Sequence, residues 1–173
     1  DNDRLAGVVH ISDYNKPVVL MNYYAFLLDF EQKLRDLLVL EGMTNEDMIA
    51  FYGAKREDPH YAKQHHKYTR EPNWVAPMQA LSPFQVFPIQ ELLRFAWAEG
   101  IFFCKEDEIN QLRKLRNSIM HGQDAVGREG NLFSYESLAT HFERIRLFVY
   151  YYKRLHILLH KATGHNKRVR NTA

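Results

Sequence analysis

The chain has 173 residues, of which 46% are hydrophobic and 13% aromatic, and this is enough to bury a core. Its formal net charge of +2 is only mildly basic, so charge alone makes no strong case for nucleic acid. Cys104 is the single cysteine, which excludes an intrachain disulfide, and no apolar run is long enough to span a membrane. We therefore expect one cytoplasmic domain with at most a small appendage.

The first 16 residues differ in pattern from the rest, and Leu5 to Ile11 has the composition of a short strand. The run Gly7-Val8-Val9-His10-Ile11-Ser12-Asp13 is similar to the closing segment of a CBS module, whose pattern is Gly-(Ile/Val)-Val-Thr-x-x-Asp. The resemblance implies that Asp13 contacts a regulatory adenosine nucleotide, whereas His10 stands where the family has Thr. The alternative is a plain N-terminal arm. Because the chain begins without Met, we expect it to belong to a longer protein.

Residues 17–163 have the pattern of an all-α domain, a bundle of about five helices. The predicted helices cover residues 18–41, 45–54, 89–99, 105–121 and 134–162. In the first of them, the buried stripe is predicted to comprise Leu20, Tyr24, Leu27, Leu34 and Leu38. The last helix is apolar over so much of its surface that we expect it to pack against both the core and a partner. Gly164 is expected to end it, leaving 164–173 as a disordered basic tail.

Residues 55–76 form the least regular stretch of the domain. Three basic residues in it, Lys63, Lys67 and Arg70, are interleaved with Tyr68 and Trp74. We predict that the basic groups meet RNA phosphates and that the aromatic rings stack on unpaired bases. The alternative is a solvated loop or short helix without a ligand. The histidines of this stretch lack the paired spacing of metal ligands, so no metal and no cofactor are predicted.

The stretch Leu115-Arg116-Asn117-Ser118-Ile119-Met120-His121-Gly122 brings together side chains that could act on a phosphate. It closes a predicted helix whose apolar stripe is Ile109, Leu112, Leu115 and Ile119. Asn117 and His121 are four residues apart and share a face, whereas Arg116 points roughly 140° away from His121. One helix therefore makes only a loose site, and we predict a two-fold homodimer with the motif at its seam.

Arg-Asn-x-x-x-His at the end of a helix, in an all-helical chain of this size, resembles the HEPN superfamily over about residues 18–162. The family pattern is Arg, four to six residues, then His, and it belongs to metal-independent endoribonucleases with an active site across a homodimer. The resemblance implies that His121 transfers protons and that Arg116 holds the scissile phosphate. Members paired with a nucleotidyltransferase antitoxin carry Tyr two residues after the His. Gln123 stands there in this chain, which disfavours that subgroup.

We therefore predict an endoribonuclease in which the 2′-hydroxyl of RNA attacks the neighbouring phosphate. Asn117 would position the histidine or the phosphate, and Arg113, one turn before Arg116, would add a phosphate contact. A role as a toxin or defence effector is implied by the resemblance alone. The alternative is a non-catalytic dimerisation or RNA/nucleotide-binding module, in which Arg116 forms a surface salt bridge and His121 caps the helix.

Overall fold

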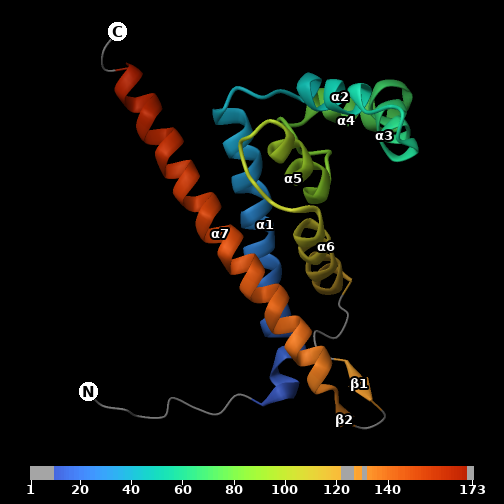
Figure 1. Ribbon diagram of the computed structural model, residues 1–173, viewed down its shortest axis with the longest axis vertical. Coiled ribbons are helices and arrows are strands. Elements are labelled where there is room, and N and C mark those ends of the chain that lie inside the picture. Colours follow the sequence, from blue (N-terminus) through green and yellow to red (C-terminus); the bar gives the residue numbers. More distant parts are fainter. Residues whose placement is uncertain (1–9, 122–126, 130–131, 171–173) are drawn as a thin grey trace.

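The computed structural model describes residues 10–121, 127–129 and 132–170, and within them the chain is almost entirely helical (Figure 1). The elements are η1 (Ile11–Asn15), α1 (Pro17–Leu40), α2 (Asn45–Ala54), α3 (Pro59–Arg70), α4 (Pro72–Ala80), α5 (Ile89–Ala98), α6 (Glu106–Met120), β1 (Arg128–Glu129), β2 (Leu132–Phe133) and α7 (Tyr135–Arg170). The two short strands pair antiparallel, with Arg128 opposite Phe133. The all-α class is confirmed, with seven α-helices in the described part rather than about five.

Helix starts follow the local capping signals of the sequence. Pro17 occupies the first turn of α1, where its missing N–H costs no hydrogen bond. The Thr44 hydroxyl accepts from the Asp47 N–H at 3.3 Å, and the Asp47 carboxylate accepts from the Thr44 N–H at 2.9 Å, so a capping box begins α2. Gly42 has a φ of +82° directly after α1, a conformation that glycine adopts without strain.

The stretch interpreted as irregular, residues 55–76, instead contains all of α3 and the start of α4. Asp58 caps α3 by accepting from the His60 N–H at 2.8 Å, and Pro59 and Pro72 each occupy a first turn. The prediction of an irregular stretch relied on the polar composition of these residues, whereas their helix caps and first-turn prolines favour helices.

The helices form a central group and a smaller group at one end of it (Figure 1). In the central group, α1 packs against α5, α6 and α7, and α6 also packs against α5 and α7. In the end group, α3 packs against α2 and α4. The ribbon shows α1 and α7 running in the same general direction, while α6 runs opposite to both. Helix α6 thus runs away from the end group, and its C-terminal end is the end farther from α3.

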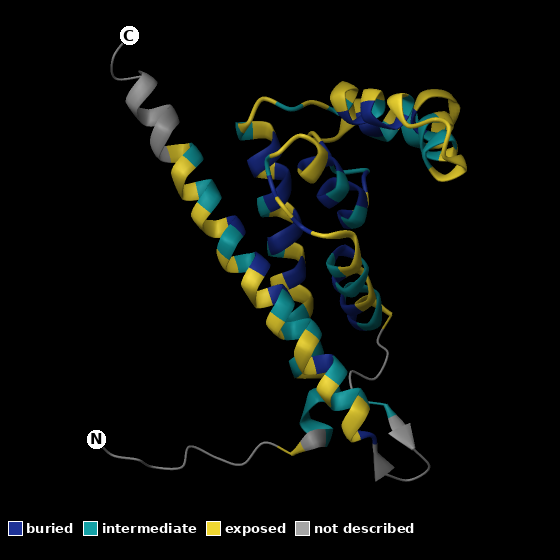
Figure 2. Ribbon diagram, in the orientation of Figure 1, coloured by how far each residue is buried: buried dark blue, intermediate teal, exposed yellow. Residues whose placement is uncertain are grey.

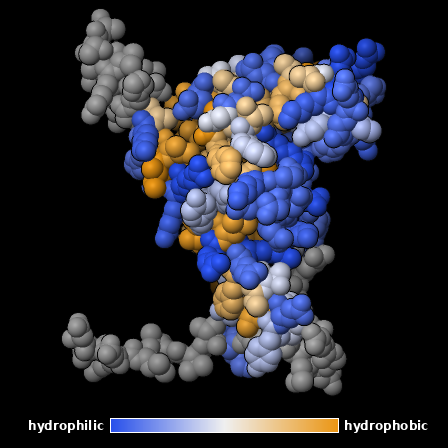
Figure 3. Space-filling model, in the orientation of Figure 1, coloured by the Kyte–Doolittle hydropathy of each residue, from blue (hydrophilic) through white to orange (hydrophobic). Residues whose placement is uncertain are grey.

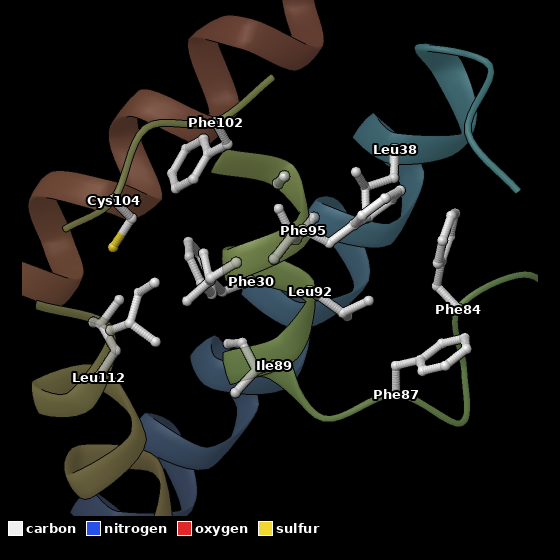
Figure 4. Packing of buried hydrophobic residues seen from close by; sticks show 14 of the residues in the cluster. Phe30, Leu38, Phe84, Phe87, Ile89, Leu92, Phe95, Phe102, Cys104 and Leu112 are labelled. Atoms are coloured by element: carbon white, nitrogen blue, oxygen red, sulfur yellow. The ribbon is translucent and has the colours of Figure 1, made fainter. Parts of the chain in front are cut away.

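The buried core follows the inner faces of α1, α5, α6 and α7 (Figure 2). Phe30 lies near its centre, with ring centroids 6.5 Å from Phe102 and 5.5 Å from Phe148, both edge to face. Figure 4 shows the aromatic and aliphatic side chains of this cluster interleaved between α1, α5, α6 and α7. Of the stripe predicted on α1, Leu27, Leu34 and Leu38 are buried, whereas Tyr24 is 38% exposed.

The two ends of the chain differ from their predictions. Residues 1–9, which hold most of the expected strand, lie outside the described residues, and at Ile11 a 3-10 helix begins instead. At the other end, α7 does not end at Gly164 but continues as helix to Arg170, so the predicted boundary of a disordered tail is wrong. None of the described helices combines the length and the apolarity that a membrane crossing requires.

Candidate active site

Helix α6 carries the Arg-Asn-x-x-x-His motif on its last turns. Its predicted stripe is confirmed, because Ile109, Leu112, Leu115 and Ile119 are all buried. At its start, the Glu108 carboxylate accepts from the Lys105 N–H at 3.0 Å and so satisfies a free backbone donor. The buried stripe orients the helix, and this decides which motif side chains face the neighbouring helices.

Arg116 points into the seam between α6 and α1. Its Nε donates to Oε1 of Glu31 at 3.3 Å, and Glu31 is only 7% exposed. The other carboxylate oxygen of Glu31 lies 3.3 Å from an Nη of Arg35, which is also buried. A carboxylate buried between two guanidinium groups is compensated in charge and restricts the orientation of both. Arg116 is therefore held in place from a helix 85 residues earlier in the chain.

The same network extends to a strained residue in the connection between α4 and α5. Arg35 Nε donates to the Phe84 carbonyl at 3.2 Å, and the Phe84 N–H donates to Oδ1 of Asn45 at 2.8 Å. Phe84 has a φ of +65°, a conformation that costs energy for a bulky residue. Both of its backbone groups are therefore fixed by side chains, and the guanidinium of Arg35 is held through Nε and Nη2.

The outer edge of Arg116 remains accessible. The residue's side chain is 31% exposed, and its Nη1 lies 3.5 Å from Oδ1 of Asn117, at the long limit of a hydrogen bond. Its Nη2 makes no hydrogen bond within the described residues. A guanidinium anchored through Nε presents its two terminal nitrogens as a fork that matches the geometry of a phosphate.

His121 lies at the C-terminal cap of α6 and is exposed. Its backbone N–H donates to the Asn117 carbonyl at 3.0 Å, so the helix remains regular up to this residue. Helical geometry places His121 one turn from Asn117 and roughly 140° from Arg116. The structure therefore brings an Nη of Arg116 close to Asn117, whereas His121 lies one turn beyond Asn117 and points away from Arg116.

The basic residues predicted to bind RNA on α3 are not next to the motif (Figure 1). Lys63 and Arg70 are exposed and belong to α3, a helix that Figure 1 shows beyond the N-terminal end of α6, away from the motif. Lys67 is engaged locally, with its Nζ 3.4 Å from the centre of the Trp74 ring, and burial lowers its pKa. Tyr68 is buried in the core, so the prediction that it stacks on a base is wrong.

Arg113 is the predicted phosphate contact that the structure does place near the motif, because it is exposed on α6 one turn before Arg116. The carboxylate of Asp13, the predicted nucleotide contact, is bound by neighbouring residues of its own segment. It accepts from the His10 N–H at 2.7 Å and pairs with Lys16 at 2.6 Å, and Lys16 holds the pKa of this carboxyl below its ordinary value. The described residues contain no group of three or more metal-ligating side chains.

Glu31 is the site residue that the sequence prediction missed. A signal was present, because Glu31 lies four residues after Leu27 and three before Leu34, on the buried stripe of α1. A carboxylate on an apolar stripe needs a cationic partner across the interface. Cys104 has no comparable role, since burial raises the pKa of its thiol to about 12.

An apolar groove runs beside the motif between α1, α6 and α7, with a cavity volume of about 350 Å³. Its floor is formed by buried residues, among them Leu115 and Ile119 of α6, and its rim by Phe26, 54% exposed, and Val149, 41% exposed. Figure 3 shows apolar side chains gathered where α7 crosses α1, whereas the side formed by α3 and α6 is mostly hydrophilic. The motif helix α6 therefore forms one wall of this apolar groove.

Comparison with known proteins places the chain in no family, because no protein-family model, curated protein or solved structure matches it. The fold and the site define it as an all-α domain with an arginine, an amide and a histidine at the end of one helix.

Proposed function

We propose that the chain is a metal-independent endoribonuclease with Arg116, Asn117 and His121 in its active site. The observation that carries the proposal is the state of Arg116, whose Nε is anchored by the buried Glu31 while its outer edge stays accessible beside Asn117. A phosphate-binding arginine needs accessible terminal nitrogens for a bidentate contact, and the partly exposed side chain of Arg116 offers them. Arg113 lies one turn away and adds positive charge on the same stretch of helix.

The chemistry needs no group outside the protein and the RNA. A base removes the proton of the 2′-hydroxyl, and the oxygen attacks the adjacent phosphorus. The bond to the 5′-oxygen then breaks as that oxygen takes up a proton, leaving a 2′,3′-cyclic phosphate and a 5′-hydroxyl. His121 serves in proton transfer, and Arg116 stabilises the extra negative charge on the phosphate in the transition state.

A homodimer would complete this site. Within one copy Arg116 and His121 point roughly 140° apart, so two copies meeting at the end of α6 can supply what a single helix does not. The apolar groove beside α6, with Phe26 and Val149 exposed at its rim, offers a surface for such an association. A role as a toxin or defence effector would follow from the HEPN resemblance and stays part of this proposal.

The test is cleavage of a labelled single-stranded RNA in EDTA by the wild-type chain and by the His121→Ala variant. We expect the variant to cut about 10²–10⁴-fold more slowly, the usual contribution of a general acid–base group. The matched control is His160→Ala, because His160 is also an exposed helical histidine but lies on α7 outside the motif. Equal cleavage by His121→Ala and the wild type would overturn the proposal.

A second candidate is a non-catalytic dimerisation or RNA-binding module. The observation that favours it is the same ion pair, because a contact between Arg116 and Glu31 also joins α6 to α1 and stabilises the fold. The two candidates differ in products. A module binds RNA without producing a cyclic phosphate end, and mass spectrometry of the incubated RNA distinguishes them.

A further inference from the structure

A second cavity lies on another side of the motif helix, in the seam between α6 and α7, and has a volume of about 720 Å³. This volume is within the range of roughly 300–1,000 Å³ that is typical of ligand sites. Unlike the apolar groove, it is lined mostly by polar and charged side chains: Gln111 from α6, and Thr140, Glu143, Arg144, Arg146 and Tyr150 from α7, with Leu147 as an apolar member. Two arginines in one cavity favour an anionic ligand.

Arg144 is positioned for such a ligand. Its Nε donates to Oε1 of Gln111 at 3.1 Å, which fixes the guanidinium across the seam between the two helices. Its terminal nitrogens make no hydrogen bond within the part of the chain that the structure describes. Arg144 thus repeats the arrangement of Arg116, an arginine anchored through Nε with its fork directed elsewhere. Arg146 is exposed and supplies a second cation two residues along α7.

Tyr150 adds an aromatic surface at one end of the cavity. It is 55% exposed, and the neighbouring Tyr151 ring stands edge to face with it at 5.0 Å, which limits its motion. Exposed tyrosines beside arginines are typical of sites where unpaired bases stack while phosphates are neutralised. The lining extends from Thr140 to Tyr150, about 15 Å along α7, and this length suits a strand better than a single phosphate.

The cavity is oriented toward the motif. Tyr151 contacts Glu108 and Arg144 contacts Gln111, so going forward along α6 means going backward along α7. The Thr140 end of the cavity therefore lies toward the end of α6 that carries Asn117 and His121. Gln111 is roughly 80° around α6 from His121, on the side away from Arg116. A strand leaving the motif past His121 would enter this cavity.

We propose that the cavity between α6 and α7 binds single-stranded RNA next to the cleaved bond, with Arg144 and Arg146 on phosphates and Tyr150 stacked on a base. The inference rests on the proposed function, since it names how the substrate of that site is held. Glu143 also lines the cavity, and its carboxylate opposes a phosphate and lowers the affinity.

The test measures binding separately from cleavage. The probe is a fluorescein-labelled ten-nucleotide RNA with 2′-O-methyl groups, which lacks the attacking hydroxyl, and the readout is anisotropy. We expect Arg144→Gln and Tyr150→Ala each to raise Kd about tenfold, since stacking and charge-assisted contacts contribute on this scale. Arg146→Gln should reduce the slope of log Kd against log salt by about 0.7, the value for one phosphate contact on a single strand.

Two controls make the result specific. Lys161→Gln removes an exposed positive charge from the same helix outside the cavity, and we expect less than a twofold change in Kd. Glu143→Gln removes the opposing charge and should tighten binding about threefold, an effect that a damaged fold would not produce.

The outcomes separate this inference from the nuclease proposal. Weaker binding by the Arg144 and Tyr150 variants supports the cavity even if the wild type cuts no RNA, in which case only the nuclease proposal fails. Unchanged Kd values for those variants overturn the cavity even if the wild type cuts RNA. Absence of binding by the wild type overturns the inference as well.

Discussion

Two buried glutamates, Glu31 on α1 and Glu91 on α5, contact Arg116 and Arg94 respectively, and these two arginines differ in how many of their nitrogens are bound. Arg94 donates through Nη1 to Glu91 at 2.8 Å and through Nε and Nη2 to Glu106, so all three of its nitrogens are engaged. Arg116 donates through Nε to Glu31 and makes only a long contact to Asn117. The side chain of Arg94 is 19% exposed and that of Arg116 is 31% exposed.

The difference lies in the number of carboxylates around each guanidinium. Glu91 is fully buried and also contacts Nε2 of His60 at 3.1 Å, and with Glu106 it closes a network in which Arg94 has no free edge. Glu31 forms ion pairs with both Arg116 and Arg35, and no second carboxylate contacts Arg116 within the described residues. The first network serves the fold, whereas the second leaves a cation at the surface in a defined orientation. A buried partner alone therefore does not show that an arginine is structural.

The largest expected effect is on cleavage by Arg116→Gln. We expect the rate to fall about 10²–10³-fold, because one donor to the charge that develops in the transition state is removed. The free energy of unfolding should fall by only about 1 kcal/mol, since Glu31 keeps its contact with Arg35. Cleavage in EDTA and urea unfolding measure the two quantities on the same preparation. A wild-type rate in this variant would remove the distinction between the two arginines.

Arg94→Gln should show the opposite pattern. It leaves Glu91 fully buried with only His60 as a partner, and breaking a buried ion pair on one side costs about 3 kcal/mol. Cleavage per folded molecule should not change, because all three guanidinium nitrogens of Arg94 are bound to Glu91 and Glu106 and none is available to a substrate. Urea unfolding gives the stability, and the rate is corrected by the folded fraction. An unchanged unfolding midpoint would contradict the structural role of this network.

Glu31→Gln tests the anchor. The amide keeps an acceptor for Arg116 Nε but loses the charge, so we expect the guanidinium to be less well oriented and cleavage to slow about tenfold. The equivalent change in the other network, Glu91→Gln, should affect stability without affecting the rate per folded molecule. Equal rates for Glu31→Gln and the wild type would show that the orientation of Arg116 does not depend on this carboxylate.

The smallest effect concerns pH. Arg94 holds the pKa of Glu106 below its ordinary value, so the folded state favours the ionised carboxylate. This stability is present above the unfolded pKa, whose ordinary value is 4.5, and is lost as the pH falls through the lower pKa of the folded state. Glu106 is 50% exposed, so the contribution should stay below about 1 kcal/mol. Glu106→Gln should flatten the unfolding free energy between these two pKa values, and an unaltered pH profile would exclude the contribution.

Much of the local structure could be predicted from the sequence. The capping box of Thr44 and Asp47, the stripe of α6 and the turn at Gly42 each depend on residues within a few positions of one another. The prediction of an irregular stretch at 55–76 was wrong because the capping signals of Asp58 and Pro59 were outweighed by polar composition. The end of α7 was misplaced because Gly164 lies within a long helix rather than after it.

The sequence by itself determined the all-α class, the start of most helices and the spacing of Arg116, Asn117 and His121 on one helix, because helical periodicity and capping are local properties. Only the tertiary structure decided that Glu31 anchors Arg116 and that Gln111 anchors Arg144. These pairs are separated by 85 and 33 residues. Their contacts follow from how α1, α6 and α7 pack around Phe30 and its neighbours, and packing between distant helices is not encoded in any local pattern.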